Sequence, residues 1–264
     1  MRLLSPSLSA VALVALAGWL VGCGAESTAQ VTSHVSGRLT IRADADSLSD
    51  FSDFEVIIAS NLRGDLDTLA VSVTDAEGRF SMGVRAQDRG IYPLMISRGG
   101  QTLTIEEIVI ADGDSVRVTA AFPLDGRAVR IVSKENAAWS AYKNTKAQYN
   151  NGVLELVQSN PDYSEQDMGR LLGQTSSILW SLQQTYPGTF GSMVANAEAA
   201  VMMEGWDDAL AVSRAAEISQ THPSKVEIVR AVRRSVARLS GQGAAVAFIR
   251  SHITGEDPEK DAAL

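Results

Sequence analysis

Few residues of this chain have the types and spacing that chemistry requires. Cys23 is the single cysteine among 264 residues, so an intramolecular disulfide, a CxxC redox pair and a cysteine-based zinc site are excluded. The three histidines, His34, His222 and His252, lie far apart, and none has an HxxH or HExxH spacing. A metal site would need a coincidence of tertiary structure, so surface or capping roles are the simpler interpretation. We therefore expect neither a metal nor a cofactor.

The sequence also lacks the motifs of nucleophilic catalysis and of phosphate-binding loops. The chain has no GxSxG and no SxxK motif, and its glycine-rich stretches at 98–100 and 241–243 lack the spacing and the lysine of a Walker loop. We therefore expect that the protein is not an enzyme. A hydrolase with a scattered site remains a third possibility, which predicts a deep pocket with convergent histidine and carboxylate groups.

Charged and aromatic groups recur in three patterns, each with two interpretations. Carboxylates gather at Asp44, Asp46, Asp50, Asp53, Asp65 and Asp67, where calcium could bind, but the spacing differs from an EF-hand loop and solvated loops are the better interpretation. Arginines follow a predicted helix at Arg230, Arg233, Arg234 and Arg238, which predicts a solvated face, or docking against an acidic partner or lipid headgroups. Aromatic residues occupy helical spacing at Trp139, Tyr142, Tyr149, Trp180, Tyr186 and Trp206, which predicts core packing, or a ligand groove.

The elements that hold these residues change character along the chain. Residues 34–133 alternate apolar and polar types in short runs, and we expect strands at 35–43, 54–60, 68–74, 79–84, 92–97, 103–110, 115–122 and 128–132. Turn residues separate these runs, which predicts an antiparallel β-sandwich. The fold class is therefore α+β, because helical spacing takes over after Ser133.

An irregular helical domain is expected over residues 134–253, with a flexible polar tail at 254–264. The spacing predicts helices at 134–149, 165–185, 190–203, 206–220, from Pro223 onward, and at 244–252. Ser164 and Asp167 have the spacing of a capping box, with Asp in place of Glu. Pro223 suits the first turn of the helix that it begins.

The N-terminus has the organisation of an export signal. Met1-Arg2 gives a positive start, residues 8–21 are an uncharged apolar run, and Leu20-Val21-Gly22-Cys23 follows. These four residues resemble the lipobox of bacterial lipoproteins. The resemblance implies a signal peptide at 1–22, lipidation of Cys23 and a tether at 23–33. The alternative is a signal anchor, or a secreted protein with an incidental cysteine.

The resemblance also implies a location. Gly24 and Ala25 follow the cysteine where an inner-membrane protein of this class has Asp, so we expect the outer membrane, facing the periplasm. The whole chain has a net charge of −8, and removing the leader with Arg2 leaves 22 basic and 31 acidic residues, or −9. This balance disfavours nucleic acid as a partner, because phosphate contacts need clustered cations.

Two further resemblances concern the β region. Residues 74–80, TDAEGRF, are similar to the Asp-x-x-Gly-x-Phe turn of prealbumin-like sandwiches in exported bacterial proteins. The order of VSGRL, DAEGRF, GIYPL, IADGDSVRV and KEN over residues 35–149 resembles the N-terminal β domain of TlpA/ResA-type thioredoxin-like lipoproteins. In that family a helical spacer and a thioredoxin-like domain follow. The spacer phrases TYPGT and THPS occur here, at 185–189 and 221–224, whereas the CxxC does not.

These observations predict a non-catalytic, lipid-anchored cell-envelope protein with a binding or scaffolding role. Its expected partners are the membrane, through the lipid on Cys23, and an envelope protein. The alternative is the membrane-proximal accessory part of a thiol-disulfide oxidoreductase system that lacks its own CxxC domain.

Overall fold

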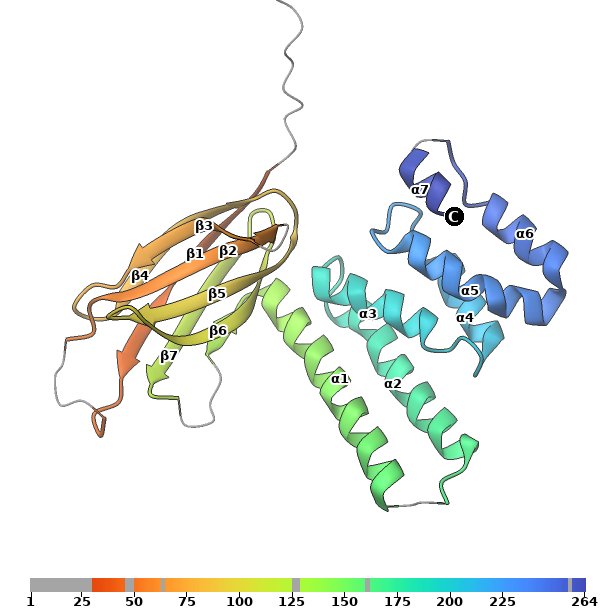
Figure 1. Ribbon diagram of the computed structural model, residues 1–264, viewed down its shortest axis with the longest axis horizontal. Helices are drawn as coiled ribbons and strands as arrows, with labels where there is room; N and C mark the ends of the chain where they lie inside the picture. The colour runs from red at the N-terminus through yellow and green to blue at the C-terminus, as the bar shows by residue number, and fades with distance from the viewer. Residues whose placement is uncertain (1–29, 46–49, 63–64, 125–128, 160–161, 256–257) are drawn as a thin grey trace, which may run out of the picture.

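The computed structural model describes residues 30–45, 50–62, 65–124, 129–159, 162–255 and 258–264. Over these residues the protein is α+β, with two four-stranded sheets followed in the chain by seven helices (Figure 1). The strands alternate exposed and buried residues, as β4 does throughout its length. The strand bounds are β1 Val31–Ile41, β2 Phe54–Leu62, β3 Asp65–Val73, β4 Arg79–Ala86, β5 Gly90–Arg98, β6 Gln101–Ile110, β7 Ser115–Phe122 and β8 Arg130–Val132.

The two sheets have the strand orders β4-β1-β7-β8 and β3-β2-β5-β6. All neighbouring strands are antiparallel except β1 and β7, which pair in parallel from His34 opposite Ser115 to Ile41 opposite Phe122. The expectation of a purely antiparallel arrangement is therefore wrong at this pair. Five strands lie between β1 and β7 in the chain, so no hairpin turn constrains their relative direction.

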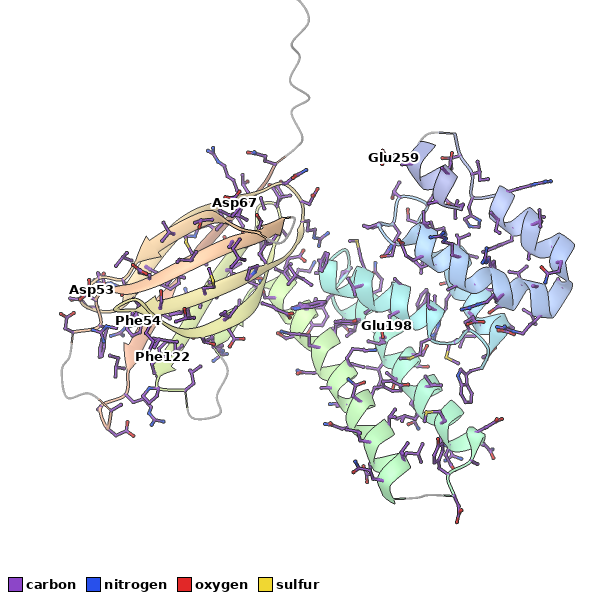
Figure 2. The ribbon with its side chains drawn as sticks, in the orientation of Figure 1. Asp53, Phe54, Asp67, Phe122, Glu198 and Glu259 are labelled. Atoms are coloured by element: carbon purple, nitrogen blue, oxygen red, sulfur yellow. The ribbon has the colours of Figure 1, made fainter. Side chains whose placement is uncertain are left out.

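A single apolar core lies between the sheets and draws its side chains from both of them. Its largest fully buried residues include Leu39 of β1, Phe54 and Ile58 of β2, and Ile108 of β6. The rings of Phe54 and Phe122 stack with centroids 5.5 Å apart, at the end of the strands away from helix α1 (Figure 2). This shared core makes the two sheets one packing unit.

The turn at residues 74–80 has the geometry that its sequence predicts. Asp75 Oδ1 accepts hydrogen bonds from the backbone N–H groups of Glu77 and Arg79, at 3.1 and 2.8 Å. Gly78 has a φ of 77°, and a Cβ there would lie 1.8 Å from the Leu39 carbonyl oxygen. Phe80 is buried in the core. The turn therefore fixes β4 beside β1.

The helices begin immediately after the last strand. Their bounds are α1 Lys134–Ser159, α2 Glu165–Thr185, α3 Phe190–Val201, α4 Asp208–Glu217, α5 Lys225–Ser240, α6 Gln242–Arg250 and α7 Pro258–Ala263. The first helix continues ten residues beyond its expected end at Tyr149. Leu171 of α2 packs 3.1 Å from the Cβ position of Gly152, which extends the interface between these two helices. Tertiary packing thus outweighs the low helix propensity of Asn150, Asn151 and Gly152.

The capping residues show where the other helices begin more accurately than the spacing of apolar residues does. Ser164 and Asp167 form the predicted capping box, with each side chain bonded to the other residue's backbone N–H. Asp207 caps α4 through the N–H of Leu210, so α4 begins at Asp208 rather than at Trp206. The Pro223 helix begins at Lys225, after the turn. Within the expected flexible tail, Asp261 of α7 accepts hydrogen bonds from the N–H groups of Thr254 and Gly255.

The helices are joined to the sheets at a junction centred on Asn136 of α1. Its side-chain amide bonds both backbone groups of Val109 on the free edge of β6, accepting from the N–H at 2.8 Å and donating to the C=O at 3.0 Å. Glu135 pairs with Arg89 from the β4–β5 turn and accepts from the N–H of Phe190. A buried side-chain amide thus replaces the missing strand neighbour of β6.

Helix α3 lies against α1 and α2 within the helical part (Figure 1). A Cβ at Gly191 would lie 2.5 Å from the backbone nitrogen of Trp139, so only glycine allows this approach. Glu198 of α3, labelled in Figure 2, accepts a 2.6 Å hydrogen bond from the Tyr142 hydroxyl and pairs with Lys146. Burial and this carboxylate raise the pKa of Tyr142. Among the helices of the described residues, none is both long and apolar enough to cross a membrane.

Candidate functional site

The predicted lipidation site, Cys23, lies outside the described residues, as do the signal peptide and most of the tether. Strand β1 begins at Val31, within the range expected for the tether. Only seven residues therefore separate Cys23 from the sheet. At about 3.3–3.6 Å per extended residue, the distance from Cys23 to Val31 is at most about 29 Å.

The three histidines occupy separate places, each with a local partner. His34 Nε2 lies 2.9 Å from the Ser81 hydroxyl on the outer face of a sheet, and His252 Nδ1 lies 2.7 Å from the Phe248 carbonyl oxygen. His222 bonds to two backbone groups. In the described part of the chain, no three His, Cys, Asp or Glu side chains gather as a metal site would require.

The acidic loop residues do not converge on one point. Asp44 pairs with Arg42, and Asp50 accepts from the backbone N–H of Ser52. That N–H and the Ser52 hydroxyl hold the pKa of the Asp50 carboxyl below its ordinary value. Asp53 accepts from the Ser52 hydroxyl at 3.2 Å, whereas Asp46 lies outside the described residues. Asp67 is exposed on β3, and the side chain of Asp65 is outside the described set.

Half of the arginine stripe of α5 is neutralised by carboxylates from the α3–α4 connection and the start of α4. Arg234 and Arg238 pair with Glu204 at 2.9 and 2.5 Å, and Arg238 also pairs with Asp208 at 2.7 Å. The Arg238 guanidinium holds the pKa of Asp208 well below its usual range. This half of the stripe binds one helix to its neighbours.

A different group of arginines forms a cationic surface on one of the two sheets. The exposed residues of β4, β1, β7 and β8 include one arginine or more from every strand, on the outer face of that sheet. We call this surface the arginine face, and its arginines are Arg38, Arg79, Arg85, Arg117 and Arg130. Strand register brings three of them into one row, Arg79–Arg38–Thr119–Arg130, which crosses all four strands. Arg85 lies six residues further along β4, opposite Thr32.

A neighbouring row adds Arg117 between hydroxyl groups. Ser36 of β1 lies opposite both Ser81 of β4 and Arg117 of β7. Arg117 is therefore diagonal to Arg38 and to Arg130, a relation that places residues about 7–8 Å apart on one face. An open groove of about 880 Å³ follows these rows, lined by the serines, Thr119 and three of the arginines.

The arginines differ in how far the protein itself neutralises them. Arg79 pairs with Asp75 at 2.9 Å and with Glu77 at 2.8 Å, and Arg38 Nε donates to the Glu77 carbonyl oxygen. The backbone N–H and the guanidinium of Arg79 hold the pKa of Asp75 below its ordinary value. Among the described residues, Arg117 and Arg130 have no carboxylate within ion-pair distance. These two cations are thus available to an external anion.

Such a surface has the chemistry of an anion-binding site. Guanidinium groups bind phosphate and carboxylate oxygens in a bidentate manner, and serine and threonine hydroxyls supply further donors. On this face His34 Nε2 lies 2.9 Å from the Ser81 hydroxyl, which is the spacing of a nucleophile and its base, but among the described residues no side chain is hydrogen-bonded to the other ring nitrogen of His34 to orient it. Recognition of anionic groups is therefore the chemistry that the arginine face supports.

This site could not be recognised in the sequence, because its arginines are scattered over five separate positions in four strands. The sequence does show that the arginines occupy the polar positions of their strands. Arg38, Arg79, Arg85 and Arg117 all alternate with apolar residues. That alternation assigns each arginine to an outer face but does not say which strands are neighbours. The parallel β1–β7 pair, which was not expected, is what joins them.

No protein-family model matches the chain, and no curated protein sequence matches it. Among solved structures, the crystal structure of an (S)-allantoin synthase aligns with 39% of this chain at 10% sequence identity and a TM-score of 0.27. The chain covers 44% of the length of that structure, less than half. A likeness of this size indicates neither a shared fold nor a shared activity.

Proposed function

We propose that this protein is a non-catalytic lipoprotein of the bacterial cell envelope, anchored through lipid on Cys23, whose arginine face binds the anionic headgroups of the anchoring membrane. The observation on which the binding role rests is the collection of five exposed arginines on one sheet face of an acidic protein. The location follows from the lipobox-like residues and is proposed as the outer membrane, facing the periplasm.

The tether supports the membrane as the source of the anions. β1 is both the strand that continues from the tether and an inner strand of the sheet with the arginine face. A reach of at most about 29 Å keeps that sheet beside the bilayer that holds Cys23. Acyl chains and a basic surface together give stable attachment where one signal alone is marginal.

Charge segregation supports an orientation with this face toward the lipid. The mature chain has a net charge of −9, so the rest of its surface is repelled by an anionic bilayer. Each basic side chain near such a surface contributes about 1 kcal/mol of attraction at physiological salt. Attraction on one face and repulsion elsewhere would hold the protein in a single orientation.

The proposal for the β region includes a prealbumin-like sandwich of the kind found in TlpA/ResA-type lipoproteins. The two sheets around one core and the Asp75–Phe80 turn support it. A scaffolding contact with an envelope protein remains compatible with this arrangement. The alternative accessory role in thiol-disulfide exchange stays a prediction from the resemblance alone.

Two experiments test the two parts of the proposal separately. Cys23→Ser should abolish metabolic labelling with a lipid precursor, and unchanged labelling would refute the anchor. For the headgroup contact, the Cys23→Ser chain is mixed with vesicles containing an anionic lipid and with purely zwitterionic vesicles, and sedimentation measures binding. Arg117→Gln with Arg130→Gln should lower binding to the anionic vesicles about tenfold or more.

A matched control removes the same charge elsewhere. Arg230→Gln with Arg233→Gln changes two exposed arginines of α5 and should leave vesicle binding within about twofold. Equal losses for both pairs would show that only net charge matters and would contradict a specific arginine face. If inorganic phosphate at micromolar concentration displaces the protein from the anionic vesicles, the arginine face is instead a site for free anions.

A further inference from the structure

A second hollow lies in the helical part, apart from the arginine face. It has a volume of about 450 Å³ and is half-enclosed by α2, α3 and the turn between α4 and α5. Cavities of about 300–1,000 Å³ are the usual size for small ligands. Its lining includes Trp180, Gln184, Asn196, Glu217 and His222.

The wall formed by the α4–α5 turn is held rigidly. His222 Nδ1 accepts a hydrogen bond from the N–H of Ser224 at 3.0 Å, so the ring proton is on Nε2, which donates to the Met193 carbonyl oxygen at 3.1 Å. The hydrogen bond that Nδ1 accepts requires a neutral ring, and burial lowers the pKa of His222 in the same direction. Because both ring nitrogens are hydrogen-bonded to the backbone, His222 links the start of α5 to α3 and is not a base or a metal ligand.

A buried lysine fixes the other side of the same turn. Lys225 is 5% exposed, and its ammonium donates to the carbonyl oxygens of Ala215 and Ile218 at 3.0 and 2.8 Å. These carbonyls belong to the C-terminal end of α4, where a cation is favoured. Ile218 itself lines the cavity. The cavity wall is therefore preorganised, which lowers the cost of binding.

The indole of Trp180 is also fixed in place. The Arg214 guanidinium carbon lies 5.2 Å from the Trp180 ring centroid, and Arg214 is held by the Ser176 hydroxyl and by the Ala199 carbonyl oxygen. Arg214 is 6% exposed and does not line the cavity. Arg214 covers one face of the indole and holds in place the part of Trp180 that lines the cavity.

One polar group in this cavity lacks a partner. Asn196 Oδ1 is buried, and no described donor lies within hydrogen-bond distance of it. An unpaired buried acceptor destabilises a fold, so it is a candidate for satisfaction by a bound group. Asn196 lies one helical turn beyond Met193, whose carbonyl oxygen accepts from His222, and both residues line the cavity. The Oδ1 atom has almost no accessible surface in this structure, so a donor in the cavity would bond it only after the Asn196 side chain rotates toward the ligand.

The lining defines the chemical class of the ligand. The aromatic ring suits a flat apolar face, while the amides of Gln184 and Asn196 and the carboxylate of Glu217 suit hydroxyl groups. Glu217 is the charged member of this lining and is negative, and His222 is neutral, so an anionic ligand is disfavoured. We infer that the cavity binds an uncharged, polyhydroxylated ring of saccharide chemistry.

The test uses the Cys23→Ser full chain and three defined probes, the trisaccharides of N-acetylglucosamine, of α-linked glucose and of β-linked glucose. Isothermal titration should show one of them binding with a Kd in the range of about 0.1–1 mM, as expected for a partly enclosed site. Absence of binding by all three at concentrations tenfold above that range would overturn the inference.

The Asn196→Leu variant separates a binding role from a structural one. Leucine has a similar size and removes the unpaired acceptor, so the variant should be at least as stable as the parent while binding the trisaccharide about tenfold more weakly. A matched control, Asn150→Leu on the exposed surface of α1, should leave binding unchanged. Unchanged affinity in Asn196→Leu would overturn the assignment.

Two further variants keep the test decisive. Gln184 is exposed, so Gln184→Ala retains the fold and should weaken binding several-fold if the saccharide occupies the cavity. The Arg117→Gln, Arg130→Gln chain should bind the trisaccharide with unchanged affinity, because the arginine face lies on the β-sheet. Failure of vesicle binding and failure of saccharide binding are thus independent results.

Discussion

The amide of Asn136 gives the most quantitative prediction about how the two parts of the protein are joined. The residue is 2% exposed, and its side chain satisfies both the N–H and the C=O of Val109, which is itself fully buried. Asn136→Ala would leave both backbone groups unpaired in place. Each unpaired buried group costs about 1–3 kcal/mol, so we expect the free energy of unfolding to fall by about 2–5 kcal/mol.

Thermal unfolding followed by circular dichroism measures this loss. For a chain of this size 1 kcal/mol corresponds to about 2–4 °C, so the Tm should fall by about 4–20 °C. Asn144→Ala, an exposed asparagine on the same helix, is the control and should change stability by less than about 0.5 kcal/mol. Asn136→Asp should also destabilise, because a carboxylate cannot donate to the Val109 carbonyl. A loss below about 1 kcal/mol in Asn136→Ala would refute the bridging role.

Three other predictions concern stability and organisation. Lys225→Met should lower the free energy of unfolding by about 1–3 kcal/mol in urea titration, because the carbonyl oxygens at the end of α4 lose their donor. The pKa of Asp208 in the folded state lies below its value of about 3.9 in the unfolded state. The carboxylate therefore contributes its full stabilisation above about pH 5, and this contribution is lost as the pH falls further. Asp208→Asn should weaken the pH dependence of the urea midpoint below pH 5. A fragment that ends at Ser133 should give a strand-type circular dichroism spectrum, and a strongly helical spectrum would contradict the two-part organisation.

Features encoded by neighbouring residues could be predicted from the sequence. The capping box of Ser164 and Asp167 and the turn at Asp75–Phe80 need only residues within five positions of each other, and both have the predicted geometry. The switch from strands to helices could be predicted because the apolar period changes there, and α1 begins at Lys134. Local hydrogen bonds and periodicity suffice for all of these.

Features that depend on which elements are neighbours could not be predicted. The parallel pairing of β1 with β7 joins strands separated by most of the β region, and no local pattern specifies it. The role of His222 depends on Met193, which comes from another helix. The unpaired Oδ1 of Asn196 is a property of packing and has no sequence signal. Both candidate sites are therefore products of tertiary structure.

The position of β1 has a mechanical consequence. Eight of its residues pair with β4 and eight pair with β7, so the strand that follows the proposed tether is held on both sides. A pull on Cys23 would act along β1, and sliding the strand out would require these two rows of hydrogen bonds to break together in shear. Forced unfolding is governed by the rate of crossing that barrier. A tethered chain built this way would resist drag on its helical part far better than one whose anchor led into an edge strand.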